Sequence, residues 1–126
     1  MKLRIKGDSL RLRLTQGEVA ALAEHGVVED QVRFGPGVAL AYRVTCDANI
    51  ERMIAAYGPG GIDVRVPEPL ARNWCATEEV TLSDSQEAGD ISLRIVVEKD
   101  FACLSPREGE DESDNFPHPL AGVKTC

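Results

Sequence analysis

Hydrophobic and polar residues alternate along the start of the chain, through residues 1–14. Apolar side chains stand between the charged ones, and Gly7 with Asp8 interrupts the alternation once. The alternating cations are Lys2, Arg4, Lys6, Arg11 and Arg13. A period of two is typical of a strand with one buried face, and glycine accepts the positive φ of a tight turn. The sequence therefore predicts a β-hairpin with a leucine face and a cationic face.

A helix is predicted to begin at Thr15, directly after this hairpin. Thr15 and Glu18 form a capping box, in which each side chain accepts a hydrogen bond from a free backbone amide. Val19 and Leu22 follow helical spacing, and Gly26 supplies the C-terminal stop.

The remaining elements repeat this order. Turn residues separate six further alternating runs, at 28–34, 38–46, 49–57, 62–66, 79–86 and 91–98, and a second short helix at 67–74. Each half of the chain thus reads strand, strand, helix, strand, strand, and residues 12–15 correspond to residues 64–67. This order predicts a tandem ββαββ repeat, although a small α+β chain can also alternate in this way by chance.

The predicted fold class is α+β, with an antiparallel sheet or partly closed β-barrel of about eight strands and two short helices. The apolar faces of these elements should form the core. The expected core residues are Leu10, Leu12, Leu14, Val19, Leu22, Val64, Val66, Leu70, Trp74, Leu93, Ile95 and Val97.

Length and charge narrow this picture further. A chain of 126 residues corresponds to one domain, and we expect the irregular acidic segment 100–126 to pack on it. The net charge of −7 argues against a protein that binds nucleic acid or anionic membranes non-specifically. The four cysteines form no CxxC pair, and no apolar stretch resembles a signal peptide or a membrane span. These features favour reduced thiols and a cytoplasmic location.

Both ends of the chain resemble a known family. The opening MKLRIKGDSLRLRLT and the closing EKDFACLSPREGEDESDNFPHP are similar to a family of small uncharacterised bacterial proteins, a domain of unknown function. The resemblance implies a bacterial cytoplasmic protein and brings no activity with it. This chain has His118 where the family closes on Phe-Pro-Asn-Pro.

The C-terminal segment contains candidate metal ligands. Thiolate and imidazole suit zinc, and carboxylates can complete a site for zinc or another divalent metal. The candidates are Cys103, Asp114, His118 and Cys126. Their spacing matches no zinc or EF-hand motif. The alternative is that Cys103 is buried as a small hydrophobic residue and the acids form a solvated face.

Arginines on the predicted strands are candidate anion ligands. The candidates are Arg4, Arg11, Arg13, Arg65 and Arg94, with Arg107 in the acidic segment. A closed barrel with these side chains inside would resemble the triphosphate-tunnel hydrolases. The Glu-x-Glu-x-Lys strand that holds the metal in those enzymes reads Lys2-Leu3-Arg4-Ile5-Lys6 here. The alternative is that the arginines are solvent-facing strand residues.

We therefore expect a small non-enzymatic binding or interaction protein with no catalytic residues, whose specific surface is the segment 100–119. Its partner would be a protein or a small anionic ligand. The alternative is a metal-dependent phosphate-ester hydrolase that uses the strand arginines and the tail carboxylates. We also expect the acidic tail to dock on the cationic hairpin, anchored by the ring of Phe116. Arginines that converge in one cavity would favour the enzyme, and arginines spread over an outer face would favour the binding protein.

Overall fold

Eight strands and two helices make up the part of the chain that the structure describes, a computed structural model covering residues 1–101, 114 and 116. In the first half the elements are β1 (Lys2–Ile5), β2 (Ser9–Leu14), α1 (Gln16–His25), β3 (Val27–Gly35) and β4 (Val38–Asp47). In the second half they are β5 (Ile54–Gly58), β6 (Gly61–Pro67), α2 (Glu68–Ala76), β7 (Thr81–Ala88) and β8 (Ile91–Lys99). The predicted α+β class is confirmed.

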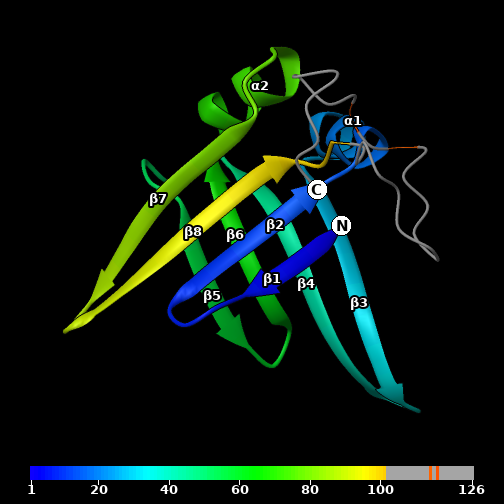
Figure 1. Cartoon of the computed structure of the whole chain (residues 1–126), viewed down its shortest axis with the longest axis vertical. Helices are drawn as coiled ribbons and strands as arrows, with labels where there is room; N and C mark the ends of the chain where they lie inside the picture. The colour runs from blue at the N-terminus through cyan, green and yellow to red at the C-terminus, as the bar shows by residue number, and fades with distance from the viewer. Residues whose placement is uncertain (102–113, 115, 117–126) are drawn as a thin grey trace.

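The strands form two four-stranded sheets, with the orders β1-β2-β8-β7 and β3-β4-β6-β5. The two sheets face each other with their strands crossing, and both helices lie at the same end of the pair (Figure 1). The outer pairs of each sheet are antiparallel, but the central pairs β2/β8 and β4/β6 are parallel. Both sheets are therefore mixed and the described strands close no barrel, which corrects the expectation of purely antiparallel pairing. The physical reason is that each helix carries the chain from one sheet to the other, so hairpins from different halves pair.

The predicted tandem repeat is confirmed in strand order and register. Leu10 lies opposite Ile95 in the first sheet, and Ile62 lies opposite Tyr42 in the second. Leu10 and Ile62 are 52 positions apart, while Tyr42 and Ile95 are 53 apart. Each sheet therefore contains the first hairpin of one half and the second hairpin of the other half.

Polar contacts at the sheet edges also occur in equivalent positions of the two halves. The α-amino group of Met1 lies 3.3 Å from Asp30 Oδ2, and the backbone amide of Met53 donates to Asp84 Oδ2 at 3.2 Å. Asp30 pairs with Tyr42 in β4, and Asp84 pairs with Ile95 in β8, so the two aspartates are equivalent. Asp30 of β3 therefore bonds to the residue before β1, and Asp84 of β7 bonds to the residue before β5. Each contact joins edge strands of different sheets.

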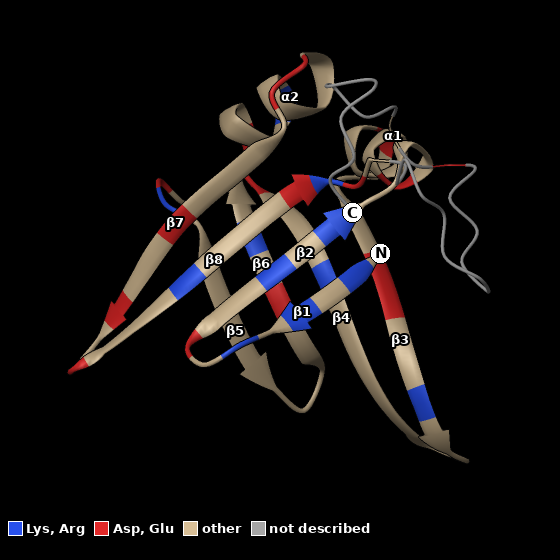
Figure 2. Cartoon of the chain, viewed as in Figure 1, with Lys and Arg blue, Asp and Glu red and all other residues tan. Residues whose placement is uncertain are grey.

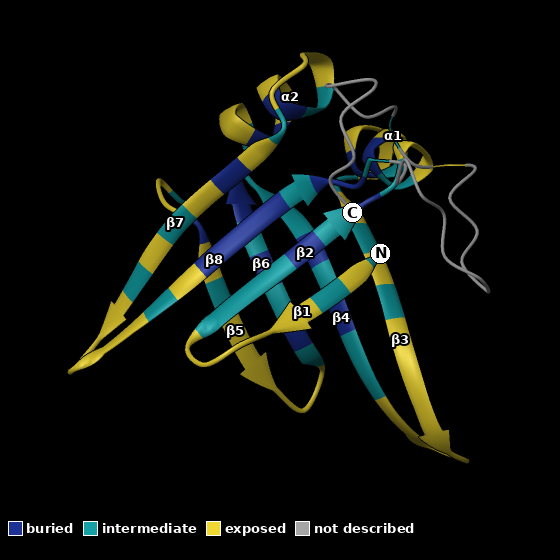
Figure 3. Ribbon diagram, viewed as in Figure 1, coloured by how far each residue is buried: buried dark blue, intermediate teal, exposed yellow. Residues whose placement is uncertain are grey.

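The core lies between the two sheets and is closed at one end by the helices (Figure 3). Trp74 is completely buried, and its indole nitrogen donates to Val80 O at 2.9 Å. The confirmed core predictions are Leu12, Leu14, Val19, Leu22, Val64, Val66, Trp74, Ile95 and Val97, while Leu10 and Leu93 are half-buried and pack against them. Leu70 is 46% exposed, so its assignment to the core was wrong. The inward face of α2 is set by Ala71 and Trp74 instead.

The ends of α1 match the sequence. The capping box between Thr15 and Glu18 is present, with both reciprocal hydrogen bonds formed. Gly26 adopts the left-handed conformation with a φ of 77°, and its amide donates to Leu22 O at 2.9 Å. Neither helix in the described part of the chain is long and apolar enough to cross a membrane.

Candidate functional site

Six cations gather on the outer side of the sheet β1-β2-β8-β7. Leu12 and Leu14 point into the core, so Arg11 and Arg13, which alternate with them along β2, point outwards. The strand register places the cations of β1 and β8 on that same side. Figure 2 shows the positive segments of β1, β2 and β8 in neighbouring strands. We call this surface the cationic face; it consists of Lys2, Arg4, Lys6, Arg11, Arg13 and Arg94.

Carboxylates balance only part of this charge. Arg11 Nη1 and Arg13 Nε donate to the same oxygen of Glu98, at 3.1 and 2.7 Å. Arg4 lies directly opposite Arg11 in the ladder, so two like charges face each other across adjacent strands. Among the described residues, no carboxylate pairs with Arg4 or Arg94. Within that part of the chain, Arg4 and Arg94 therefore leave positive charge on the cationic face without a paired carboxylate.

Arg65 lies away from the cationic face, on the outer side of the other sheet. Its Nε donates to Asp47 Oδ2 at 2.8 Å and its Nη1 to Asp63 Oδ2 at 2.7 Å. The hydrogen bond from Arg65 is the main cause of the lowered pKa of Asp47. The predicted arginines thus do not line a common lumen, because the inner faces of both sheets are filled by the apolar core. Arg107 lies outside the described residues.

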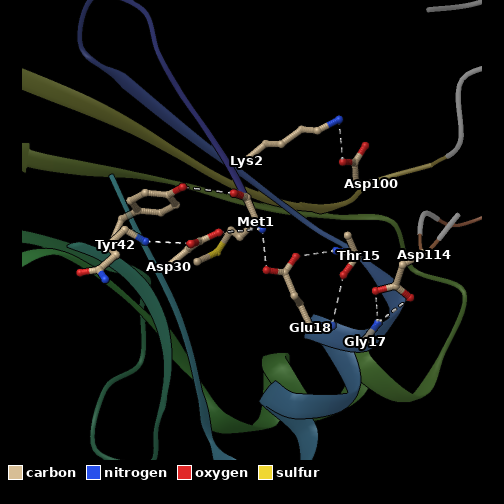
Figure 4. A network of polar contacts seen from close by, with 10 residues as sticks. Met1, Lys2, Thr15, Gly17, Glu18, Asp30, Tyr42, Asp100 and Asp114 are labelled. Atoms are coloured by element: carbon tan, nitrogen blue, oxygen red, sulfur yellow. Dashed lines mark hydrogen bonds and ion pairs between the residues drawn. The ribbon is translucent and has the colours of Figure 1, made fainter. Parts of the chain in front are cut away.

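Two residues of the C-terminal segment are described, and Asp114 is the first. Its two carboxylate oxygens each lie 3.2 Å from the backbone nitrogen of Gly17, and its carbonyl oxygen accepts from Gln16 N at 2.9 Å (Figure 4). A carboxylate at this position satisfies a free amide of the first helical turn and complements the helix dipole. Asp114 was expected on the cationic hairpin and lies at the start of α1 instead. The other acids of the predicted contact, 108 and 110–112, lie outside the described residues.

Phe116 is the second described residue of this segment, and it is partly buried against the core. Its amide donates to Asp100 O at 2.7 Å, and its ring centroid lies 5.5 Å from that of Phe101. Lys99 Nζ lies 5.4 Å from the centroid of the Phe116 ring and donates to Thr77 O at 2.7 Å. The buried lysine therefore combines a hydrogen bond with a cation–π contact.

A polar cluster surrounds the backbone of Met1 (Figure 4). The α-amino group lies 2.5 Å from Glu18 Oε2, and Tyr42 Oη donates to Met1 O at 3.3 Å. Burial, followed by the charges of Asp30 and Glu18, raises the pKa of Tyr42. The cluster joins β1, α1, β3 and β4, and its groups pair with one another, so its role is structural.

A groove of about 630 Å³ lies between α1 and α2. Its lining includes Leu22, His25, Cys46, Glu68, Ala71 and Cys75. Burial raises the pKa of both thiols, so they are protonated at neutral pH and are weak nucleophiles. Sequence reasoning did not find this groove, because the cysteines are 29 positions apart and no local motif joins them.

Of the four predicted metal ligands, only Asp114 lies among the described residues. Within residues 1–101, 114 and 116, no group of three or more histidine, cysteine or acidic side chains could hold a metal ion. Asp114 is already bonded to Gly17, and Cys103, His118 and Cys126 lie outside the described residues.

Comparisons with known proteins identify the family. No curated protein and no solved structure matches the chain. A family model described as a family of unknown function, DUF7009, matches residues 1–120. The match spans nearly the whole chain, including the hairpin and the tail on which the resemblance rested. The chain therefore belongs to DUF7009, a family of unknown function.

Proposed function

We propose that the protein is a small non-enzymatic binding protein whose cationic face holds an acidic segment of a protein partner. The observation that carries this proposal is the charge of Arg4 and Arg94 on that face, which no described carboxylate balances. Guanidinium groups suit carboxylates because they can donate two parallel hydrogen bonds. Thr81, Ser83 and Ser85 of β7 pair with outward-facing positions of β8 and add hydroxyl groups to the same side of the sheet.

An acidic peptide suits this surface better than a nucleic acid. The whole molecule carries a net charge of −7, so its charge outside the cationic face is strongly negative. A long polyanion would meet that negative surface as soon as it extended past the sheet. A short acidic segment can be held by the cationic face alone.

The phosphate-ester hydrolase alternative receives less support. It required the arginines to converge in one cavity, but Arg65 and the cationic face lie on the outer sides of different sheets. The surface expected at residues 100–119 lies mostly outside the described residues, so the proposal rests on the cationic face. We also propose a bacterial cytoplasmic location, which the free thiols of Cys46 and Cys75 support.

The test is binding of a synthetic octaglutamate peptide, measured by isothermal titration calorimetry at low and high salt. The wild-type protein should bind, and its affinity should fall as salt rises because the contacts are ionic. The double variant Arg4→Glu/Arg94→Glu should bind about tenfold more weakly or worse, in line with the loss of two charge-assisted contacts.

Arg33→Glu is the matched control. Arg33 is exposed on β3 of the other sheet, and in the described part of the chain it has no ionic partner. Its reversal should change the affinity less than twofold. An equal loss in both variants would mean that net charge and not the cationic face controls binding. Tighter binding of an oligonucleotide of equal charge would show that the partner class is wrong.

A further inference from the structure

The tandem repeat predicts that every surface near the helices occurs twice. The groove between α1 and α2 is lined by Cys46 at the end of β4 and by Glu68 at the start of α2. Cys46 lies opposite Val66 in the parallel ladder, and Lys99 lies opposite Leu14 in the other. Lys99 is therefore the equivalent of Cys46.

The start of α1 completes the second copy of this surface. Gln16 is the first residue of α1 and Glu68 is the first residue of α2, 52 positions later. Likewise Trp74 in α2 corresponds to Leu22 in α1, which also lines the groove. The surface around Gln16, Trp74 and Lys99 is thus the repeat of the groove around Glu68, Leu22 and Cys46.

The chain itself occupies one of these two surfaces. Asp114 O accepts a hydrogen bond from Gln16 N, and the ring of Phe116 lies over Lys99. Phe116 also packs against the core cluster and donates its amide to Asp100 O. Asp114 and the aromatic side chain of Phe116 therefore contact this copy. No described residue covers the other copy in the same way.

We propose that the groove between α1 and α2 binds a peptide segment of a partner protein through an aromatic side chain. The ring would lie over Cys46, where Phe116 lies over Lys99 in the other copy. A thiol is a favourable neighbour for an aromatic ring, as are the apolar Leu22 and Ala71 on the same floor. A backbone carbonyl two residues before the aromatic residue would accept from Glu68 N, as Asp114 O accepts from Gln16 N.

One sequence difference between the copies defines the specificity. Gly17 donates its amide to the Asp114 carboxylate, but the equivalent position in α2 is Pro69, which has no N–H. The groove therefore lacks the donor that selects an acidic residue. Its ligand needs the aromatic side chain and does not need an aspartate two residues earlier.

The test uses the full chain and a synthetic peptide with the sequence of residues 112–119, ESDNFPHP. A titration followed by ¹⁵N–¹H NMR should shift the amides of Gly26, Cys46 and Ala76, which line the groove. The peptide with alanine in place of phenylalanine should bind at least tenfold more weakly, because the buried ring is the anchor. The peptide with asparagine in place of aspartate should bind within twofold of the original.

Two protein variants complete the test. Ala23→Trp places a large side chain in the groove from an exposed helix position and should weaken binding at least tenfold. Ala88→Trp, at the exposed tip of the β7/β8 hairpin, is the control and should bind like the wild type. If only the amide resonances of Gln16 and Lys99 shift, the peptide has merely displaced Asp114 and Phe116 from the other surface. That result would overturn the proposal. Groove shifts that depend on protein concentration without peptide would also overturn it, since a second copy would then be the occupant.

Discussion

Asp84 shows how one side chain can hold a sheet edge. Its carboxylate accepts hydrogen bonds from Arg52 and from the amide of Met53, which lies just before β5. The hydrogen bond from Arg52 is the largest cause of the lowered pKa of Asp84. On the same strand, Gln86 exchanges two hydrogen bonds with the backbone of Ala55, at 2.8 and 3.0 Å. Side chains of β7 thus take the place of a strand partner for β5.

Replacing Asp84 should make stability less dependent on pH. A carboxyl group with a lowered folded pKa stabilises the protein above its ordinary pKa of about 3.9 and loses that effect as pH falls through the folded value. Asp84→Asn should therefore cost about 1 kcal/mol at pH 7 and much less at pH 3. Urea unfolding at both pH values measures this difference. Asp90→Asn, which removes an exposed carboxylate from the β7/β8 turn, is the control measured at the same two pH values.

Gly61 and Gly89 show two different reasons why a hairpin turn needs glycine. Both have a positive φ, 97° and 63° respectively. A Cβ at Gly61 would lie 2.1 Å from Ala41 O, whereas nothing lies within 4 Å of one at Gly89. Gly89→Ala should cost about 1 kcal/mol for the left-handed backbone alone, and Gly61→Ala about 3 kcal/mol or more. Equal midpoints in thermal unfolding would show that β4 moves away without cost.

At the scale of elements, α1 depends on a segment nearly a hundred positions away in the chain. Thr15 and Glu18 cap it locally, and the carboxylate of Asp114 adds a contact at Gly17. A Cβ at position 17 would lie 2.9 Å from Asp114 Oδ2, so glycine leaves the space that this contact needs. Helix propensity alone indicates only that Gly17 destabilises α1, and it gives no sign of the contact with Asp114.

Phe116→Ala should weaken the contact between Asp114 and the start of α1 more than Asp114→Asn does. The Phe116 ring packs on Phe101 and the core, whereas the exposed carboxylate contact contributes little by itself. The amide of Gln16 reports the outcome, because it donates to Asp114 O. Its hydrogen exchange should accelerate about tenfold or more in Phe116→Ala and less than threefold in Asp114→Asn. Faster exchange in the asparagine variant would identify the charge as the main anchor.

Local patterns predicted the elements well and their partners poorly. Period-two alternation, the Thr15 capping box and Gly26 located strands and helix ends, because each depends on residues close in sequence. The parallel pairing of β2 with β8 depends on contacts across more than eighty positions and leaves no local signal. The cationic face followed from the alternation in residues 1–14, but the addition of Arg94 required that pairing. Leu70 was misplaced because Leu70 and Ala71 are adjacent on α2, and helical spacing alone did not decide which of them faces inwards.

At the scale of the whole molecule, neither half contains a complete sheet. Residues 1–48 provide the hairpins β1-β2 and β3-β4, which belong to different sheets. An isolated two-stranded hairpin is marginally stable in water, and each half alone would expose its share of the core. The folded state therefore needs both halves together.

Two separate fragments, 1–48 and 49–126, should show this dependence. Each alone should lack a cooperative thermal transition by circular dichroism, and an equimolar mixture should regain one as a one-to-one complex. The intact protein is the control for the transition. A cooperative transition in the 1–48 fragment as a monomer would contradict the interdependence of the halves.

The exchange of hairpins between halves also has an evolutionary consequence. A gene half this long would encode a chain that assembles the same two sheets as a symmetric pair, with two identical grooves. Duplication and fusion of such a gene removes the requirement that both grooves stay identical. In this chain one of the two equivalent surfaces has Lys99 and contacts Phe116, while the other is the groove lined by Cys46 and Glu68. Fusion thus allows one ancestral surface to specialise in closing the fold while its twin remains available for selection on a new ligand.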